Sequence, residues 1–375
     1  MKVVYIISKV SKAVAFEWIS EELPKKGVEL EFILLGENER TELKEFLDSK
    51  GIENHFLKLS SKKYYPNVLL RLIQLLRTSK ANAVHTHLFD ASLLGLMAAR
   101  IAGIKNRIYT RHHATYHHDY FPKMVKFDKL INRMATQIVA ISPNVKNVLV
   151  NRENVQVEKI RTIYHGFDLQ RFEHPQEENV QQLKAKYNPN KKGPVIACIS
   201  RYLELKGIDH VIKAFAQLLQ DYPNAYLLLF NAGGPYEKEI KSELAQIDPQ
   251  SYMEIAFESD VFSIYHLMDV FVHVPIGPNI EAFGQTYVEA LAAGIPSVFT
   301  MSGIAPEFIK HNENALVVDY SDHKQIYDSI KRILSEKELK DRLISNGKSS
   351  LEVFSLNHFI NSLEDLYKNE SNTFA

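Results

Sequence analysis

The amino-acid sequence predicts an α/β fold with two domains, each built on a parallel sheet. Short apolar runs typical of buried strands alternate with amphipathic helical stretches, as in parallel sheets covered by helices on both faces. This alternation occurs twice along the 375 residues, a length that allows two sizeable cores. Between the two occurrences, residues 174–193 are polar and contain proline, asparagine and lysine, a composition typical of an interdomain linker.

The first domain is predicted over residues 1–175. It opens with an apolar strand at 2–8, and an amphipathic helix follows at 13–23. Its later strands are expected at 30–35, 55–57, 83–85, 107–110 and 138–141. Helices are expected between them at 41–49, 69–76, 91–101 and 125–134.

The second domain is predicted over residues 190–354, where the alternation restarts at Pro194. Its strands are expected at 195–200, 225–230, 254–257, 270–274 and 296–300. Its helices are expected at 208–220, 236–245, 262–268, 323–334 and 338–345, together with one that opens at 284–286. A last helix is expected at 356–367.

Composition and charge argue against a membrane-spanning protein, a secreted disulfide-bonded protein and a nucleic-acid-binding protein. No run of 18 or more apolar residues is present, and the N-terminus turns polar too early for a secretory signal. The single cysteine, Cys198, cannot form an internal disulfide, which fits a reducing cytoplasm. Residues 1–175 hold 27 Lys and Arg against 18 Asp and Glu, in a chain without net charge. The remaining residues are therefore acidic by the same amount. The basic half indicates either an anionic partner or attraction to this acidic half. Its charge is too diffuse for a nucleic-acid site.

The most informative stretch is residues 269–300, which is predicted to be a strand–helix–strand unit. Glu281 lies in the loop after the strand, and Glu289 lies on the second turn of the helix. The amides at the helix start belong to Phe283, Gly284, Gln285 and Thr286. Unpaired N–H groups and the helix dipole favour a diphosphate there, with Glu289 placed for a ribose diol and Glu281 for hydroxyls of the group that the diphosphate carries. A glutamate near a helix start also favours the dipole by itself, which alone would explain Glu289.

The segment EAFGQTYVEALAAGIP, from Glu281 to Pro296, resembles the Glu-x7-Glu motif of retaining glycosyltransferase family 4. The resemblance extends over nearly the whole chain and is most specific over 199–318. It implies the GT-B architecture, in which two Rossmann-like domains have parallel sheets facing a central cleft. It also implies that a helix at about 355–370 packs back on the N-terminal domain.

Three further residues fit the donor side of that family. Arg201 and Lys206 follow the first strand of the second domain and resemble the pair that holds the donor diphosphate. Arginine offers a planar fork and lysine a point charge, and ligands of open α/β sheets bind at the carboxyl ends of strands. Two surface cations are the alternative interpretation. Gly233 lies in a glycine-rich loop like that of the family, where the backbone approaches the ligand closely, although Gly-Gly-Pro is also a common turn.

A histidine-rich segment follows the strand at 107–110. His112 occupies the position of the family histidine that lies beside the transferred sugar. His113 and His117 have the spacing of two zinc ligands on one helix face, but no carboxylate or thiolate other than Asp119 lies at metal-ligand spacing. Histidines interleaved with tyrosines suit sugar contact equally well. We therefore expect no metal here, as the resemblance also implies.

The run from Lys58 to Lys80 contains six Lys and Arg and no acidic residue. Such a run is consistent with peripheral contact to an anionic membrane on the cytoplasmic side. The alternative, that its leucines are core and its cations solvated, is the more common one.

The resemblance implies a retaining glycosyltransferase that uses a UDP-, GDP- or ADP-sugar donor and neither a cofactor nor a metal. The donor would bind the C-terminal domain, and a glycan or lipid-linked acceptor the N-terminal domain, in cell-surface polysaccharide synthesis. The alternatives are another GT-B enzyme, such as an epimerase or phosphorylase, and a non-catalytic protein that binds sugar nucleotides or glycans. The loop of residues 8–12 lacks the glycine pair that is usual in the family.

Overall fold

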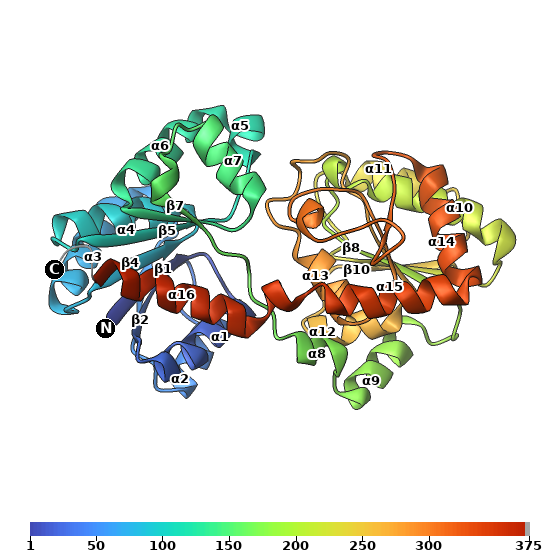
Figure 1. Cartoon of the computed structure of the whole chain (residues 1–375), viewed down its shortest axis with the longest axis horizontal. Coiled ribbons are helices and arrows are strands. Elements are labelled where there is room, and N and C mark those ends of the chain that lie inside the picture. Colours follow the sequence, from blue (N-terminus) through green and yellow to red (C-terminus); the bar gives the residue numbers. More distant parts are fainter. Residues whose placement is uncertain (372–375) are drawn as a thin grey trace. The chain divides into compact units, whose positions relative to one another are not determined.

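The computed structural model describes residues 1–371 and the side chains of residues 1–368, and the chain divides into two units (Figure 1). Unit 1 contains residues 1–166 and the C-terminal segment that begins at Leu356. Unit 2 contains Phe167–Ser355. Each unit is built on one parallel sheet covered by helices, so the predicted fold class is confirmed.

Within the described residues, unit 1 has a seven-stranded sheet in the order β3-β2-β1-β4-β5-β6-β7. The strands are β1 (Lys2–Ser8), β2 (Glu29–Gly36), β3 (Asn54–Lys58), β4 (Ala83–His87), β5 (Asn106–Arg111), β6 (Gln137–Ala140) and β7 (Ile160–Thr162). The helices are α1 (Val14–Glu22), α2 (Glu42–Ser49), α3 (Tyr65–Thr78), α4 (Phe89–Ile101), α5 (Tyr116–Tyr120), α6 (Val125–Met134), α7 (Pro143–Asn151) and α16 (Leu356–Ser371).

The two faces of this sheet carry separate cores because successive residues of a strand point to opposite faces. On β1, Val3 and Tyr5 pack with residues of α1, α2 and α16, whereas Val4 and Ile6 pack with residues of α3 and α4. Every one of these four side chains is fully buried. β1 is therefore a central strand covered on both sides, as its continuous apolar sequence predicts.

Within the described residues, unit 2 has a six-stranded sheet in the order β10-β9-β8-β11-β12-β13. The strands are β8 (Val195–Ile199), β9 (Tyr226–Phe230), β10 (Tyr252–Ile255), β11 (Val270–His273), β12 (Ser297–Phe299) and β13 (Leu316–Val317). The helices are α8 (Leu169–Glu173), α9 (Glu177–Tyr187), α10 (Ile208–Asp221), α11 (Glu237–Leu244), α12 (Val261–Ile264), α13 (Gln285–Ala292), α14 (His323–Ser335) and α15 (Lys337–Ser349).

Both sheets reverse their strand order beside their first strand. The order turns between β1 and β4 in unit 1 and between β8 and β11 in unit 2. At such a switch point the loops leave in opposite directions, and ligands of open α/β sheets bind in the crevice between them. The topology thus marks one candidate site at the carboxyl edge of each sheet.

The polar stretch expected as a linker is not one. Residues 177–187 form α9, and α8 and α9 both belong to unit 2, so the expected boundary near residue 175 is replaced by one at Gly166 and Phe167. Three residues of α9 (Val180, Leu183 and Tyr187) are buried along one face, and apart from Ala185 the other positions are polar. This narrow apolar stripe is enough to dock a helix although its composition is that of a linker.

The helix α16 packs on unit 1, where it lies beside α1 (Figure 1). Its Tyr367 is 1% exposed, and its hydroxyl hydrogen-bonds to the hydroxyl of Tyr5 and, at 2.7 Å, to Nδ1 of His85. The C-terminal helix thus completes one face of the N-terminal sheet. Among residues 1–371, no helix combines the length and apolar character needed to cross a bilayer.

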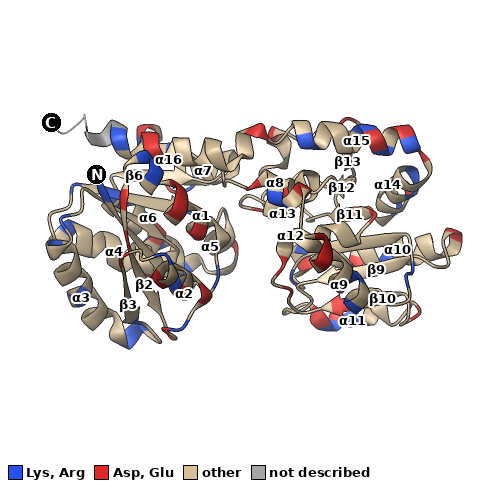
Figure 2. Cartoon of the chain, turned by 90° about the horizontal axis from the view of Figure 1, so that it is seen from below, with Lys and Arg blue, Asp and Glu red and all other residues tan. Residues whose placement is uncertain are grey.

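The run Lys58–Lys80 forms the end of β3, a loop and α3. Val68, Leu72, Ile73 and Leu76 of α3 are buried, whereas Leu70 is 61% exposed. Figure 2 shows Lys and Arg on this helix and no acidic residue. Most of the apolar residues of this run therefore serve the core, and its cations lie at the surface.

We predict that Tyr367→Phe destabilises unit 1 by about 1–3 kcal/mol, because removal of one hydroxyl leaves buried polar groups of Tyr5 and His85 without their partner. Urea unfolding followed by fluorescence measures it, since Trp18, the single tryptophan of the chain, lies on α1 and reports on unit 1. Tyr327→Phe is the surface control: its hydroxyl bonds Asp221 in unit 2, so the unfolding free energy of unit 2, followed by far-UV circular dichroism because Trp18 reports on unit 1, should change by no more than about 0.5 kcal/mol. Equal effects in the two variants would contradict the prediction.

Candidate functional site

The helix α13 begins at the carboxyl edge of the unit 2 sheet, directly after β11. Gly284 caps it with φ 90°, and a Cβ there would lie 2.6 Å from the ring of Tyr287. Only glycine fits this combination of left-handed backbone and close ring contact. The helix amides of Gln285 and Thr286 follow, and the buried hydroxyl oxygen of Thr286 has no hydrogen-bond partner within the described part of the chain. This helix start therefore has polar groups available for a ligand.

The predicted residue Phe283 contributes to this site through its backbone. Its side chain is 2% exposed and packs near the rings of Phe167 and Phe354, at centroid distances of 6.2 and 5.8 Å. Its carbonyl oxygen accepts a hydrogen bond from the amide of Ile304 at 2.9 Å. The side chain thus anchors the loop before α13 in the core.

The structure brings two predicted residues, Lys206 and Glu281, into direct contact. The ammonium of Lys206 donates to Oε1 of Glu281, and Nε2 of His273 lies 3.1 Å from the same oxygen. Lys206 ends a short turn after β8, His273 ends β11, and Glu281 lies in the following loop. This cluster of three residues therefore lies at the switch point of the sheet.

The carboxyl group of Glu281 is ionised although it is largely buried. Burial alone would raise its pKa, but the interactions with His273 and with the ammonium of Lys206 outweigh burial and lower the pKa to about 2. The loop is fixed as well, since the amide of Glu281 donates to Oγ of Ser302 at 3.1 Å. A fixed, ionised carboxylate is a strong acceptor for hydroxyl groups of a ligand.

Glu289 has a different environment from Glu281. Its Oε2 accepts a hydrogen bond from the hydroxyl of Tyr265 at 2.6 Å. Burial raises the pKa of Glu289 to about 7, and the hydrogen bond from Tyr265 opposes the rise. Glu281 and Glu289 therefore differ in their side-chain partners and in the pKa of their carboxyl groups.

The loops after β8 and β9 carry the other two predicted residues of the donor side. Arg201 is exposed and makes no ion pair among the residues that the structure describes. The amide of Tyr202 donates to the carbonyl of Gly233 at 2.9 Å, so the glycine-rich loop lies against the Arg201 loop. A Cβ at Gly234 would lie 2.4 Å from the carbonyl oxygen of Tyr202, which is why glycine is needed for this close approach.

In unit 1, His112 belongs to a cluster of four histidines that sequence spacing did not connect. Nε2 of His112 lies 3.1 Å from Nδ1 of His87 at the end of β4, and its ring stacks on His165 at 5.8 Å. His85 lies next to His87, with ring centroids 4.4 Å apart. Burial lowers the pKa of His112 and His85 to about 3 and of His165 to about 4, and it holds the pKa of His87 well below its usual value. The cluster is neutral at pH 7, so its rings both donate and accept hydrogen bonds.

A pocket of ≈ 360 Å³ lies in unit 1 beside the carboxyl ends of β1 and β2. Its lining combines the cations Lys9 and Arg40 with apolar side chains that include Leu34 and Phe56. Lys9, in the loop that lacks the glycine pair, adopts φ 56°, and its ammonium lies 2.9 Å from Asp90. Left-handed backbone in a residue other than glycine is costly and is often found at ligand sites.

Sequence reasoning missed several residues of these sites. His273 lies in an apolar strand, and its role depends on contact with Glu281 from the following loop. His85 and His87 lie two positions apart on one strand, a period-2 signal that could have placed both on one face of the sheet. No local pattern indicates their contact with His112, because neighbouring strands meet only in the folded sheet.

Comparison with known proteins matches both halves of the chain to related families. The profile described as "Glycosyltransferase Family 4" matches residues 17–171, and the profile described as "Glycosyl transferases group 1" matches residues 179–350. The capsular polysaccharide biosynthesis glycosyltransferase CapM of Staphylococcus aureus is 26% identical, over 82% of this chain and 80% of the relative. A GDP-mannose-dependent alpha-(1-6)-phosphatidylinositol monomannoside mannosyltransferase of Mycobacterium tuberculosis is 28% identical, over 50% of this chain and 49% of the relative.

Among solved structures, Anabaena Alr3699/HepE in complex with UDP and glucose superposes with a TM-score of 0.83 at 17% identity. The match covers 98% of this chain and 100% of that one, and at this identity it shows the fold. The strand orders, the two-unit division and the family profiles agree with one another. The chain is a glycosyltransferase that belongs to glycosyltransferase family 4 and has the GT-B fold.

Proposed function

We propose that the protein is a retaining glycosyltransferase of the hexosyltransferase type that uses a nucleotide-diphosphate sugar. One observation carries the proposal: Lys206, Glu281 and His273 meet at the head of α13, at the switch point of the unit 2 sheet. Such a donor carries a diphosphate and a polyhydroxylated sugar. The cation Lys206 and the amides at the start of α13 suit the diphosphate, and the ionised carboxylate of Glu281 suits the sugar hydroxyls.

The proposed division of roles follows from charge. Departure of the nucleotide creates negative charge on the diphosphate, which Arg201, Lys206 and the amides at Gly284, Gln285 and Thr286 would stabilise without a metal ion. Glu281 would orient the sugar through its hydroxyls. In a front-face displacement the departing phosphate oxygen would take the proton of the acceptor hydroxyl, and the anomeric configuration would be kept.

The remaining donor contacts fit the nucleotide part. Glu289 would accept hydrogen bonds from the ribose, and the backbone at Phe283 and Gly233 would approach the donor closely. The names of the relatives support this class of donor, because one uses GDP-mannose and one solved structure contains UDP and glucose.

For unit 1 we propose the binding of a glycan or lipid-linked acceptor. The pocket with Lys9 and Arg40 supplies cations beside apolar walls, which suits an acceptor with a phosphate and a hydrophobic part. His112 remains the proposed sugar contact in this unit. The similarity to CapM supports a role in cell-surface polysaccharide synthesis, in the cytoplasm and with α3 as a candidate contact to the inner membrane face.

The test of this function begins with thermal-shift measurements against UDP-, GDP- and ADP-sugars. A donor present at about 100 times its Kd stabilises the folded chain by about 2.7 kcal/mol, so one nucleotide class should raise the melting temperature. Lys206→Ala should abolish the rise, whereas Lys213→Ala, which removes a surface ion pair with Asp209, should keep it. Absence of a shift with every donor, together with absence of donor hydrolysis, would favour a non-catalytic protein.

With the donor known, NMR of the product should show the donor's anomeric configuration, and an inverted anomer would exclude the retaining scheme. Mg²⁺ should not change the rate of transfer by protein that was treated with chelator. Activity that is lost after chelation and restored by Mg²⁺ would show that the diphosphate needs a metal.

We predict that substitution of Glu281 mainly lowers kcat, whereas substitution of Glu289 mainly weakens nucleotide binding. Glu281→Gln should lower kcat by about 100-fold or more with little change in nucleotide affinity, because it removes a group proposed to act on the sugar. Glu289→Ala should weaken nucleotide binding by about 10-fold, the typical value of a charged hydrogen bond, with a smaller effect on kcat. Glu204→Gln, an exposed neighbour of Lys206, serves as the control. Exchanged outcomes would show that the two roles are assigned wrongly.

We also predict that His273→Leu raises the pKa of Glu281 from about 2 toward its ordinary value of 4.5, since burial then opposes ionisation with Lys206 as the remaining partner. Leucine fits the site because His273 lies between the rings of Phe271 and Tyr287. NMR titration of the glutamate carboxyl carbons measures this pKa, and His210→Leu on α10 is the control.

The same change has a defined effect on acid stability. A carboxyl whose folded pKa is below its unfolded pKa adds stability above about pH 4.5, and this addition is lost as the pH falls toward 2. The difference in unfolding free energy between the wild type and His273→Leu should therefore shrink over that range. A constant difference would mean that His273 acts by packing alone.

A further inference from the structure

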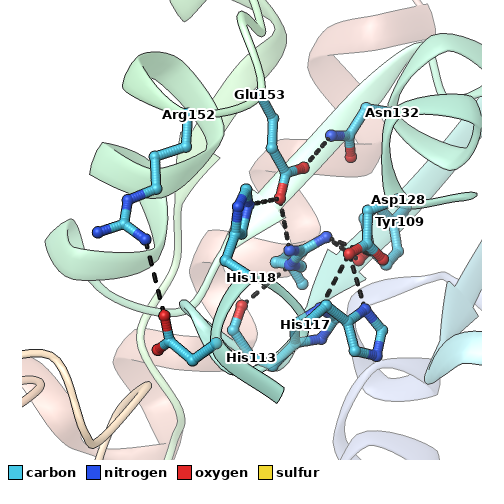
Figure 3. A network of polar contacts seen from close by, with 10 residues as sticks. Tyr109, His113, His117, His118, Asp128, Asn132, Arg152 and Glu153 are labelled. Carbon is cyan, nitrogen blue, oxygen red and sulfur yellow. Dashed lines mark hydrogen bonds and ion pairs between the residues drawn. The ribbon is translucent and has the colours of Figure 1, made fainter. Parts of the chain in front are cut away.

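Three histidines of the histidine-rich segment of unit 1 take part in a buried polar network (Figure 3). At its centre the guanidinium of Arg111, 0% exposed, lies 2.7 Å from Oε1 of Glu153 and 3.3 Å from Oδ1 of Asp128. His118 lies on the Glu153 side, at 3.1 Å, whereas His113 and His117 lie on the Asp128 side. The network holds two carboxylates for one guanidinium, so its permanent charges leave an excess of negative charge.

The Asp128 side has the geometry of a metal-ligand set. Nδ1 of His117 lies 2.7 Å and Nε2 of His113 3.5 Å from Oδ2 of Asp128, and the three ligand atoms all lie within 4.8 Å of one another. Two ligands of a tetrahedral zinc ion, each at 2.0–2.1 Å from the metal, are about 3.3 Å apart. The three atoms therefore need only small adjustments to share one ion.

Two further observations indicate that this set is suited to a cation. Nε2 of His113 is buried and makes no hydrogen bond within the described residues, although a carboxylate oxygen lies 3.5 Å away. The side chains of His113 and His117 are 23% and 11% exposed, which leaves a path for an ion from solvent.

In a second cluster of unit 1, a protein cation already occupies the place that a metal ion would take. Glu31, Glu53 and His55 also have ligand atoms within 4.8 Å of one another. There the ammonium of Lys2 lies 2.9 Å from both Glu31 and Glu53, so a protein cation already neutralises the carboxylates. At the Asp128 set, the nearest protein cation, Arg111, faces the other carboxylate oxygen, Oδ1.

Spacing along the chain pointed to the wrong carboxylate. Asp119, the carboxylate that the sequence offers beside the two histidines, is exposed and lies 3.9 Å from Arg152. Asp128 lies eleven positions after His117, on α6, and packing of α5 against α6 brings it into the set. Asp128 therefore supplies the carboxylate that sequence spacing does not reveal beside His113 and His117.

We propose that His113, His117 and Asp128 form a binding site for one divalent transition-metal ion of the zinc type, bound through Nε2, Nδ1 and Oδ2. Three protein ligands leave a fourth position toward the solvent side. The ion would fasten the segment after β5 to α6 and offset the excess negative charge of the network. This site is separate from the diphosphate chemistry proposed for unit 2, and its test does not depend on activity.

The test uses the full-length chain without a histidine tag, freed of metal by dialysis against a chelator. Zn²⁺ binding is measured by equilibrium dialysis with elemental analysis, and Co²⁺ serves as a spectroscopic probe of four-coordinate geometry. We expect one Zn²⁺ per chain, a higher melting temperature with Zn²⁺ but not with Mg²⁺, and Co²⁺ absorption that Zn²⁺ removes. Nitrogen NMR of histidine-labelled protein should show changes at Nε2 of His113 and Nδ1 of His117.

The decisive variants keep the hydrogen bonds and remove the ligands. His117→Gln retains a donor for Asp128 but is a poor zinc ligand, so Zn²⁺ affinity should fall by about 100-fold or more, beyond the 10- to 100-fold typical of an outer-shell change. His118→Gln, which alters the neighbouring contact with Glu153, should keep the affinity within about 10-fold. No Zn²⁺ bound by the wild type, unchanged histidine signals, or equal affinities of the two variants would overturn the proposal. The wild-type NMR result decides it even where a variant does not fold.

Discussion

The adjacency of β8 and β11 is the constraint on which the candidate donor site depends. The two strands begin about 75 residues apart in the chain, and the amide and carboxylate of Asp269 fix one against the other, each 2.8 Å from a backbone partner in Val195. Once these strands are neighbours, the loop that ends at Lys206 and the loop that contains Glu281 leave from the same edge. The ion pair between them, and the position of α13, follow from this one pairing.

Much of the fold could be predicted because it is written in local patterns. The helix α6 was expected with its observed bounds, and the alternation of apolar strands and amphipathic helices gave both sheets. The composition of residues 174–193 conceals α9, because it favours a linker although Val180, Leu183 and Tyr187 have helical spacing. Its polar majority is typical of a linker, but three apolar side chains on one face decide its structure.

The sites were predictable only where a function is concentrated in one segment. Glu281 and Glu289 lie eight positions apart and could be identified from the sequence alone. The candidate roles of His273 and Asp128 depend on contacts with residues of other elements, so the sequence alone does not indicate them. The same limit explains the histidine-rich segment. His112, His113 and His117 are close in sequence, yet the first joins a neutral cluster with His87 while the other two face a buried carboxylate.

The state of Glu281 argues that the cluster at the head of α13 serves a ligand. A buried ion pair contributes little to stability, because loss of hydration offsets much of the attraction between the charges. Two partners hold the carboxylate of Glu281 where one would suffice to pair its charge. If a diphosphate draws Lys206 toward itself, His273 still faces the carboxylate, and Glu281 stays ionised while the lysine changes partner. The second partner would then let Lys206 make the proposed phosphate contact and Glu281 the proposed sugar contact, although the two residues lie in different loops.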